Sequence, residues 1–183
     1  MKSAILLTGA LLALSYSASA QGTFTLQAAG SAQGVSYRAA DGGAVIVNAT
    51  GWTVQALQGA TSLFQGAATI ATLGRINNSA QTVAVTGSFA NDVVNNIVVR
   101  VWSGAASYAV AQTTPGASWG TSLPFSQTLG GPPAGGGPSV ASPSMANMQA
   151  FTVQITPVPE PSVIALAGLG LGGLILARRS KKA

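Results

Sequence analysis

A run of fifteen apolar residues, Val163 to Ala177, most constrains how this chain of 183 residues can fold. Every residue of the run is Val, Ile, Leu, Ala or Gly. As a helix it covers roughly 22 Å at about 1.5 Å per residue, whereas the hydrocarbon core of a bilayer is about 30 Å thick. Snorkelling side chains and local thinning of the bilayer can close this gap. The sequence therefore predicts a transmembrane helix at residues 162–177, apart from a domain that folds in water.

The apolar run lies between a Pro-Glu-Pro motif and a basic tail. This order resembles the PEP-CTERM sorting signal, over residues 158–183. The resemblance implies that the protein is exported, held in the membrane and then cut near the motif by an exosortase, a membrane-embedded cysteine transpeptidase-like enzyme. The implied recognition residues are Val158, Pro159, Glu160 and Pro161, and the implied cytoplasmic retention charges are Arg178, Arg179, Lys181 and Lys182. The alternative is an ordinary tail anchor, which lacks a Pro-rich motif next to the span.

The first twenty residues have the organisation of a secretory signal peptide. Lys2 provides the positive charge, and Ile5 to Leu14 form the apolar segment. Ala18 and Ala20 are the small residues that signal peptidase recognises, so we expect cleavage after Ala20. An exported domain and a cytoplasmic basic tail also agree with the positive-inside rule. We therefore expect inner-membrane anchoring with the domain outside, and the cell surface or extracellular space after processing.

The segment between the two signals, residues 21–157, carries almost no charge. It contains three arginines and two aspartates, a net charge of +1. The basic pI of about 10.3 therefore comes from the signals, and nucleic acid is not an expected partner because no basic face is formed. The segment is long enough for one domain with its own core.

Alternating apolar and polar residues predict that this domain is all-β. The clearest example is Phe151, Val153 and Ile155, and Ile97, Val99 and Val101 follow the same period. Residues 62–73 also fit a helix, although a central glycine weakens that interpretation. Residues 130–143 are rich in Gly and Pro and predict a long loop. We expect an antiparallel β-sandwich of about seven to nine strands, flanked by an N-terminal signal helix and the C-terminal transmembrane helix.

The residue types of the domain exclude most catalytic chemistry. The chain has no His and no Cys, which excludes Ser-His and Cys-His nucleophiles and the common zinc sites. Asp41 and Asp92 are the number of carboxylates that a glycosidase needs, but both lie in turn sequences. Calcium ligation by Asn91-Asp92 and Asn95-Asn96 is a weaker alternative to a turn role. We expect no enzyme activity, no cofactor and no resident metal.

Five aromatic residues provide a candidate set for stacking on sugars: Trp52, Trp102, Trp119, Tyr37 and Tyr108. Trp102 is the strongest candidate, because it falls on the strand face opposite Val101 and beside Arg100. The leading hypothesis is a non-enzymatic, exosortase-processed structural protein of the surface or extracellular matrix, associated with exopolysaccharide or the cell envelope. The alternative is a carbohydrate-binding module on the cell surface, which requires an exposed row of aromatic side chains.

Overall fold

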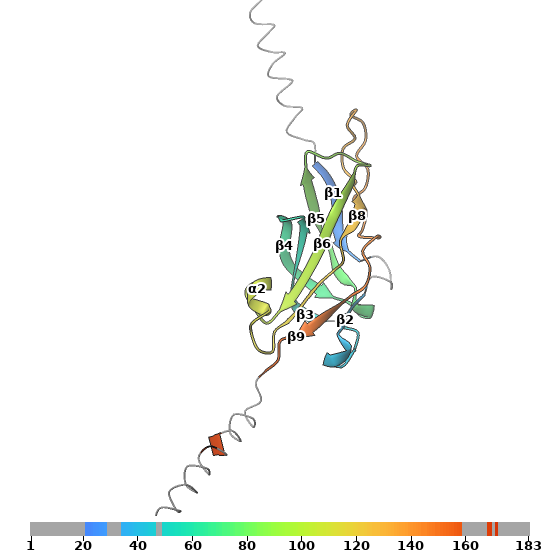
Figure 1. Cartoon of the computed structure of the whole chain (residues 1–183). Helices are drawn as coiled ribbons and strands as arrows, with labels where there is room; N and C mark the ends of the chain where they lie inside the picture. The colour runs from blue at the N-terminus through green and yellow to red at the C-terminus, as the bar shows by residue number, and fades with distance from the viewer. Residues whose placement is uncertain (1–20, 29–33, 47–48, 159–167, 170, 172–183) are drawn as a thin grey trace, which may run out of the picture.

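The computed structural model describes residues 21–28, 34–46, 49–158, 168–169 and 171 (Figure 1). The domain is all-β, with only short helical turns. The strands are β1 (Gln21–Gln27), β2 (Val35–Tyr37), β3 (Ala49–Gln58), β4 (Thr61–Ile70), β5 (Ile76–Thr86), β6 (Val93–Ser103), β7 (Ser118–Thr121), β8 (Phe125–Thr128) and β9 (Phe151–Ile155). The helical turns are the 3₁₀ helices η2 (Ala39–Asp41) and η3 (Thr72–Gly74) and the α-helix α2 (Tyr108–Ala111). The nine strands among the described residues fall within the expected range of seven to nine.

The strands form one sheet of nine, in the order β1-β5-β4-β3-β6-β7-β9-β2, with β8 also paired to β6. All pairs are antiparallel except β2 with β9. The predicted sandwich of two separate sheets is therefore not confirmed. The reason lies in β6, which is eleven residues long. One edge of β6 pairs with β3, while the other edge is long enough to hold both β8 and β7.

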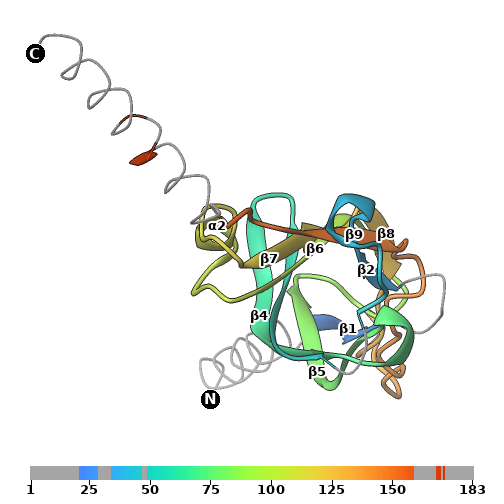
Figure 2. The same ribbon diagram turned by 90° about the horizontal axis from the view of Figure 1, so that it is seen from below.

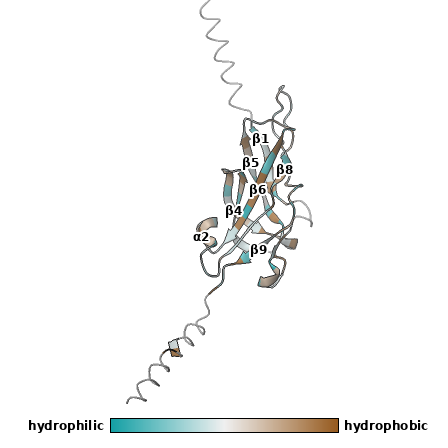
Figure 3. Ribbon diagram, in the orientation of Figure 1, coloured by the Kyte–Doolittle hydropathy of each residue, from teal (hydrophilic) through white to brown (hydrophobic). Residues whose placement is uncertain are grey.

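The predicted alternation along the strands is confirmed. In β6, Ile97, Val99 and Val101 are fully buried, whereas Arg100 lies on the opposite face. Figure 3, coloured by hydropathy, shows that β6 carries both hydrophobic and hydrophilic residues along its length. Full burial of each such aliphatic side chain contributes about 1.5–3 kcal/mol relative to an exposed position. β9 follows the same rule at Phe151 and Val153, which are buried, whereas Ile155 at the end of the strand is half-buried.

The sheet curls around one main apolar core, as the end-on view in Figure 2 shows. Side chains of β1, at one end of the sheet, meet side chains of β9 and β2, at the other end, in this core. A strongly twisted sheet brings such distant strands face to face. Residues after β8 also contribute two methionines. The largest fully buried members of this core are Phe24, Leu26, Ile70, Ile76, Ile97, Leu129, Met145 and Met148.

The open edge of β1 is covered by the segment that follows β8. Thr23 exchanges two backbone hydrogen bonds with Gly130, at 3.0 and 2.7 Å, and the Thr25 amide donates to the Pro143 carbonyl at 2.8 Å. The two ends of the Gly/Pro-rich stretch 130–143 are therefore fixed on the domain. Covering an edge in this way prevents it from pairing with another chain.

Within residues 130–143 the structure forms the predicted loop, and no strand of the sheet lies there. Gly131 and Val140 exchange backbone hydrogen bonds at 2.7 and 2.8 Å, so the loop returns on itself as a narrow hairpin. A Cβ atom on Gly130 would lie 2.7 Å from the carbonyl carbon of Ala141. Glycine is therefore required at Gly130 for the two backbones to approach.

The helical alternative for residues 62–73 is wrong, because this segment forms most of β4 and then η3. β4 pairs with β3 and with β5 in the sheet. Pairing with these neighbouring strands therefore decides the conformation of the segment. No helix among the described residues is long and apolar enough to cross a membrane. The expected signal helix at residues 1–20, and all of residues 162–177 except positions 168, 169 and 171, lie outside the described residues; those three positions are helical.

Candidate functional site

A row of polar side chains crosses the outer face of the sheet. Gln65 on β4 lies opposite Gln55 on β3, and Gln55 lies opposite Arg100 on β6. Neighbouring strands are about 4.8 Å apart, so this row extends over roughly 10 Å. The alternation that buries Val99 and Val101 also turns Arg100 outward. The row is therefore a direct consequence of the strand register.

The short helix α2 forms a wall beside this row. Ser107 caps its start, with Oγ accepting a hydrogen bond from the Val110 amide at 3.3 Å. Tyr108 then lies against Arg100, whose guanidinium carbon is 4.8 Å from the centre of the Tyr108 ring. This cation–π geometry holds the arginine side chain beside the helix. The sequence does not predict α2, because a single turn has no apolar period and its only signal is the Ser107 cap.

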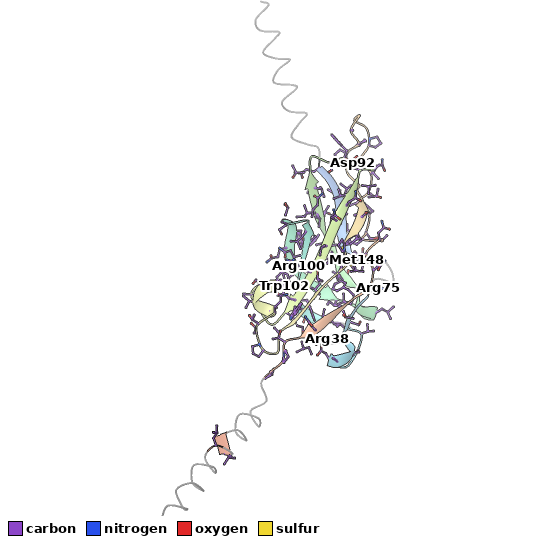
Figure 4. All side chains as sticks on the ribbon, in the orientation of Figure 1. Arg38, Arg75, Asp92, Arg100, Trp102 and Met148 are labelled. Atoms are coloured by element: carbon purple, nitrogen blue, oxygen red, sulfur yellow. The ribbon has the colours of Figure 1, made fainter. Side chains whose placement is uncertain are left out.

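An open hollow of about 380 Å³ lies between α2 and the outer face of the sheet. Its lining is mostly polar and combines amide, hydroxyl and guanidinium groups with aromatic rings. The lining residues are Gln55, Gln65, Arg100, Trp102, Ser107, Tyr108, Ala109 and Gln112. Figure 4 shows Arg100 and Trp102 on β6, near α2. Two of the lining residues, Trp102 and Tyr108, belong to the aromatic set that the sequence offered for sugar stacking.

The expected row of exposed tryptophans is not present, and this corrects the prediction. Trp102 is 1% exposed and Trp52 is 4% exposed, while Trp119 is half-buried. Trp52 belongs to the main core, whereas Trp102 belongs to a second small cluster with Ala111 and Ala117. Trp102 does lie on the outer face, as its position in the strand predicted. It is buried because α2 covers that face.

Tyr108 joins the two outer tryptophans into an aromatic cluster. Its ring is edge-to-face with Trp102 at 6.1 Å and with Trp119 at 5.8 Å between ring centres. The Trp119 indole donates to Thr156 Oγ1 at 3.2 Å. In contrast, the Trp102 indole nitrogen is buried and has no hydrogen-bond partner among the described residues. The cluster therefore contains one buried donor, next to the hollow, that no acceptor among the described residues satisfies.

Arg100 is likewise unpaired within the described part of the chain. Its Nε is buried without a partner, and both carboxylates of the domain are engaged elsewhere. Asp41 forms an ion pair with Arg38 at 3.4 Å and accepts a hydrogen bond from the Ile155 amide. Asp92 accepts from the Phe89 amide at 2.7 Å. The hollow is therefore electropositive and contains no carboxylate.

The two aspartates do not form a catalytic pair. Figure 4 shows Asp92 at one end of the domain and Arg38, which holds Asp41, at the other. A glycosidase requires its two carboxyl groups within about 10 Å of each other. No group of three or more His, Cys, Asp or Glu side chains gathers among the described residues. Asn91 and Asn96 have positive φ angles of 70° and 59°, as expected for turn residues.

The pKa of Tyr108 is raised by burial, which disfavours the phenolate, and is lowered in part by the charge of Arg100. The unfolded chain releases this proton near pH 10. Because the folded state holds the proton of Tyr108 more tightly than the unfolded chain, the protonated phenol contributes to the free energy of unfolding. This contribution is fully present below about pH 10 and is lost as the pH rises through the folded-state pKa. We expect the free energy of unfolding to fall less between pH about 9 and about 11 in Tyr108→Phe than in the wild type. Urea unfolding at both pH values measures this, with Tyr37→Phe as control; equal losses in Tyr108→Phe and the wild type would contradict it.

A second hollow, of about 290 Å³, lies near β8. It is lined by Leu123, Pro124, Phe125, Ser126, Asn147 and Gln149. Its polar side chains are mostly engaged, since Ser126 Oγ donates to Asn95 Oδ1 at 2.6 Å and Asn147 donates to the Ser126 carbonyl at 2.9 Å. This hollow contains no charged group and is the weaker candidate.

Hydrogen bonds fix the C-terminal end of the domain as far as Thr156. Its amide donates to the Ala117 carbonyl and its carbonyl accepts from the Gly116 amide, both at 2.8 Å. Its hydroxyl donates to the Ala111 carbonyl at 2.7 Å. Val158, two residues later, is 60% exposed. The predicted sorting signal therefore begins directly after the last anchored residue of the domain.

Most of the predicted sorting residues lie outside the described part of the chain. This applies to Pro159, Glu160 and Pro161, to the signal peptidase residues Ala18 and Ala20, and to the basic residues Arg178, Arg179, Lys181 and Lys182. Their roles stay predictions from the sequence.

Comparison with known proteins identifies the same C-terminal segment. Residues 157–182 match the PEP-CTERM protein-sorting motif, which confirms the resemblance found in the sequence. No curated protein and no solved structure matches the chain. The motif implies export, membrane anchoring before processing, and an exosortase as the processing partner. The match does not include the β domain or its hollow.

Proposed function

We propose that this PEP-CTERM protein is a non-enzymatic component of the cell surface or extracellular matrix, released from its membrane anchor by an exosortase. The match of residues 157–182 to the sorting motif carries the proposal. The secretory pattern at residues 1–20 supports export by an independent signal. Signal peptidase removes the first signal, and the exosortase acts at the second.

In the anchored state the folded domain lies outside the inner membrane, and the basic tail lies in the cytoplasm. The hydrogen bonds of Thr156 leave no spacer between the domain and Pro157. The exosortase therefore meets its recognition residues next to a folded domain. After cleavage the protein becomes part of the cell envelope or of an exopolysaccharide matrix.

A structural role agrees with the chemistry of the domain. The chain has no His or Cys to act as nucleophile or base. The two aspartates are engaged in local contacts at Arg38 and Phe89. A nearly uncharged surface also resists association only weakly, which suits a protein packed in a matrix.

A second candidate function is that of a carbohydrate-binding module. The observation that favours it is the polar hollow beside α2, where two glutamines and an unpaired arginine face the solvent side of the sheet. Trp52 and Trp102 do not support this candidate as stacking platforms, because both are buried. If sugar binding occurs, hydrogen bonds carry it in place of an exposed tryptophan row.

The proposed processing is tested by the intact mass and the C-terminal peptide of the protein from its native host. We expect the wild-type chain to end near Pro159 and to lack Arg178 to Ala183. Glu160→Ala removes the central residue of the recognition motif and should retain the whole tail. Ser162→Ala, directly outside the motif, is the matched control and should be processed normally.

A host without its exosortase should give the same uncut mass as Glu160→Ala. If the wild type and Glu160→Ala both keep the tail in a host that has the enzyme, the segment is a plain membrane anchor. The matrix role would then lose its main support.

A further inference from the structure

We propose that the hollow beside α2 binds a carboxylate-bearing sugar unit of an acidic polysaccharide, with Arg100 as the carboxylate ligand. The inference rests on the proposed matrix role for its biological setting and names the ligand class and the site. Three independent observations support it: an unpaired guanidinium, an unsatisfied buried indole N–H, and a row of amide side chains across the sheet.

The first observation is the state of Arg100. A guanidinium offers five N–H donors in a planar arrangement that matches a carboxylate. Here the Tyr108 ring holds the group at 4.8 Å, yet no carboxylate or carbonyl among the described residues accepts from it. Arg38 differs, since it is paired with Asp41 and also donates to Gln154 at 2.7 Å. Arg100 is therefore positioned but unpaired.

The second observation is Trp102. Its side chain is 1% exposed, it belongs to the lining of the hollow, and its Nε1 has no acceptor. A buried donor without a partner costs about 1–3 kcal/mol, so such groups are rare in folded proteins. Trp102 Nε1 and Arg100 Nε are both donors. The unsatisfied polarity beside the hollow is therefore that of donors, which favours a ligand rich in acceptor oxygens, such as carboxylate and hydroxyl oxygens.

The third observation identifies the rest of the ligand. Gln65 and Gln55 lie in register with Arg100 across three strands, and Gln112 lines the opposite wall. Amide groups both donate and accept, which suits hydroxyl groups on a sugar ring. Gln65 and Gln112 make no side-chain hydrogen bond within the described structure, while Gln55 donates to Ser62 at 3.1 Å.

These features favour an acidic saccharide over nucleic acid. Binding a polyphosphate backbone requires several clustered cations, whereas Arg100 is the single charged residue of the hollow. A volume of about 380 Å³ in an open hollow suits a sugar unit within a longer chain. The hollow lies on the outer face of the domain, where a polymer can pass across it.

The proposal is tested by calorimetric titration of the purified full chain in detergent with short oligogalacturonate. Cello-oligosaccharide of the same length is the uncharged probe, and inorganic phosphate and single-stranded DNA are the other anions. We expect oligogalacturonate to bind, with affinity that falls as salt is added, and the other probes to bind at least about tenfold more weakly. Intrinsic fluorescence should change on binding, because Trp102 and Trp119 lie in or beside the hollow.

Three variants locate the binding. Arg100→Gln should weaken oligogalacturonate binding about tenfold or more, as expected for a charge-assisted hydrogen bond. Gln65→Ala, at an exposed position on β4, should weaken it roughly threefold. Arg38→Gln removes the same charge outside the hollow and should bind like the wild type.

Equal binding by Arg100→Gln and the wild type would overturn the proposal, as would equal binding of the uncharged probe, phosphate or DNA. Absence of oligogalacturonate binding by the wild type would also overturn it. The measurement uses the uncut chain, so its result is independent of exosortase processing. A failure of the sorting proposal appears in the mass of the mature protein and not in this titration.

Discussion

Gly74→Ala is expected to lower the free energy of unfolding by about 2–5 kcal/mol, from left-handed strain together with overpacking. Gly74 has a φ of 72°, which residues with a Cβ rarely adopt. Its new Cβ would also overlap the carbonyl oxygen of Val35 and lie 2.6 Å from the Val35 nitrogen. Backbone atoms cannot rotate away from such a contact. The substitution therefore separates η3 from β2.

Gly87→Ala is the matched control for this prediction. Its φ of 78° is nearly the same, but no atom lies within 4 Å of the added Cβ. This control isolates the backbone strain, which is about 1–2 kcal/mol. Urea unfolding of both variants, followed by tryptophan fluorescence, measures the difference. If the two substitutions cost the same, the close packing of Gly74 on Val35 is not needed for stability.

Trp102→Ala is expected to cost about 3–5 kcal/mol, the range for removal of a large buried aromatic side chain. Trp102 joins β6 to α2 through Ala111 and through the ring of Tyr108. Without it, α2 loses its apolar support on the sheet and the hollow loses one wall. The loss is measured by urea unfolding followed by circular dichroism, since the substitution removes a fluorophore.

Trp102→Phe separates the packing of Trp102 from its hydrogen bonding. Phenylalanine keeps an aromatic ring under α2 and removes the Nε1 donor, which has no partner in the part of the chain that the structure describes. We expect it to cost less than half as much as alanine, because the smaller cavity is offset by the loss of an unsatisfied group. A cost equal to that of Trp102→Ala would mean that the indole N–H is satisfied in solution.

One residue, Thr156, links the wall of the hollow to the start of the sorting signal. Thr156 donates to the carbonyl of Ala111, the last residue of α2, and accepts from Trp119. The wall of the hollow and the start of the sorting segment are thus held by the same hydrogen-bonded group. A ligand in the hollow would consequently lie near the end of the domain that carries Thr156, in the same part of the fold as α2 and β9 (Figure 1).

The sequence by itself determined two features of this protein: its C-terminal sorting motif and the alternation of buried and outward-facing residues along its strands. The order of Pro-Glu-Pro, apolar run and basic tail predicted the motif that was matched at residues 157–182. The alternation in β6 and β9 predicted which side chains face the core. Both signals are local, because a sorting motif is read as a linear segment and a strand turns every second residue to the same face.

Only the tertiary structure decided how the strands join and what covers them. The single curled sheet depends on which edge of β6 accepts β7 and β8, and strand order is not written in any local pattern. The burial of Trp102 depends on α2, one turn of helix that folds back over an outward-facing position. The hollow depends on Gln55, Gln65 and Arg100 meeting across three strands. Such contacts are long-range, so their energy is gained only once the whole chain has folded.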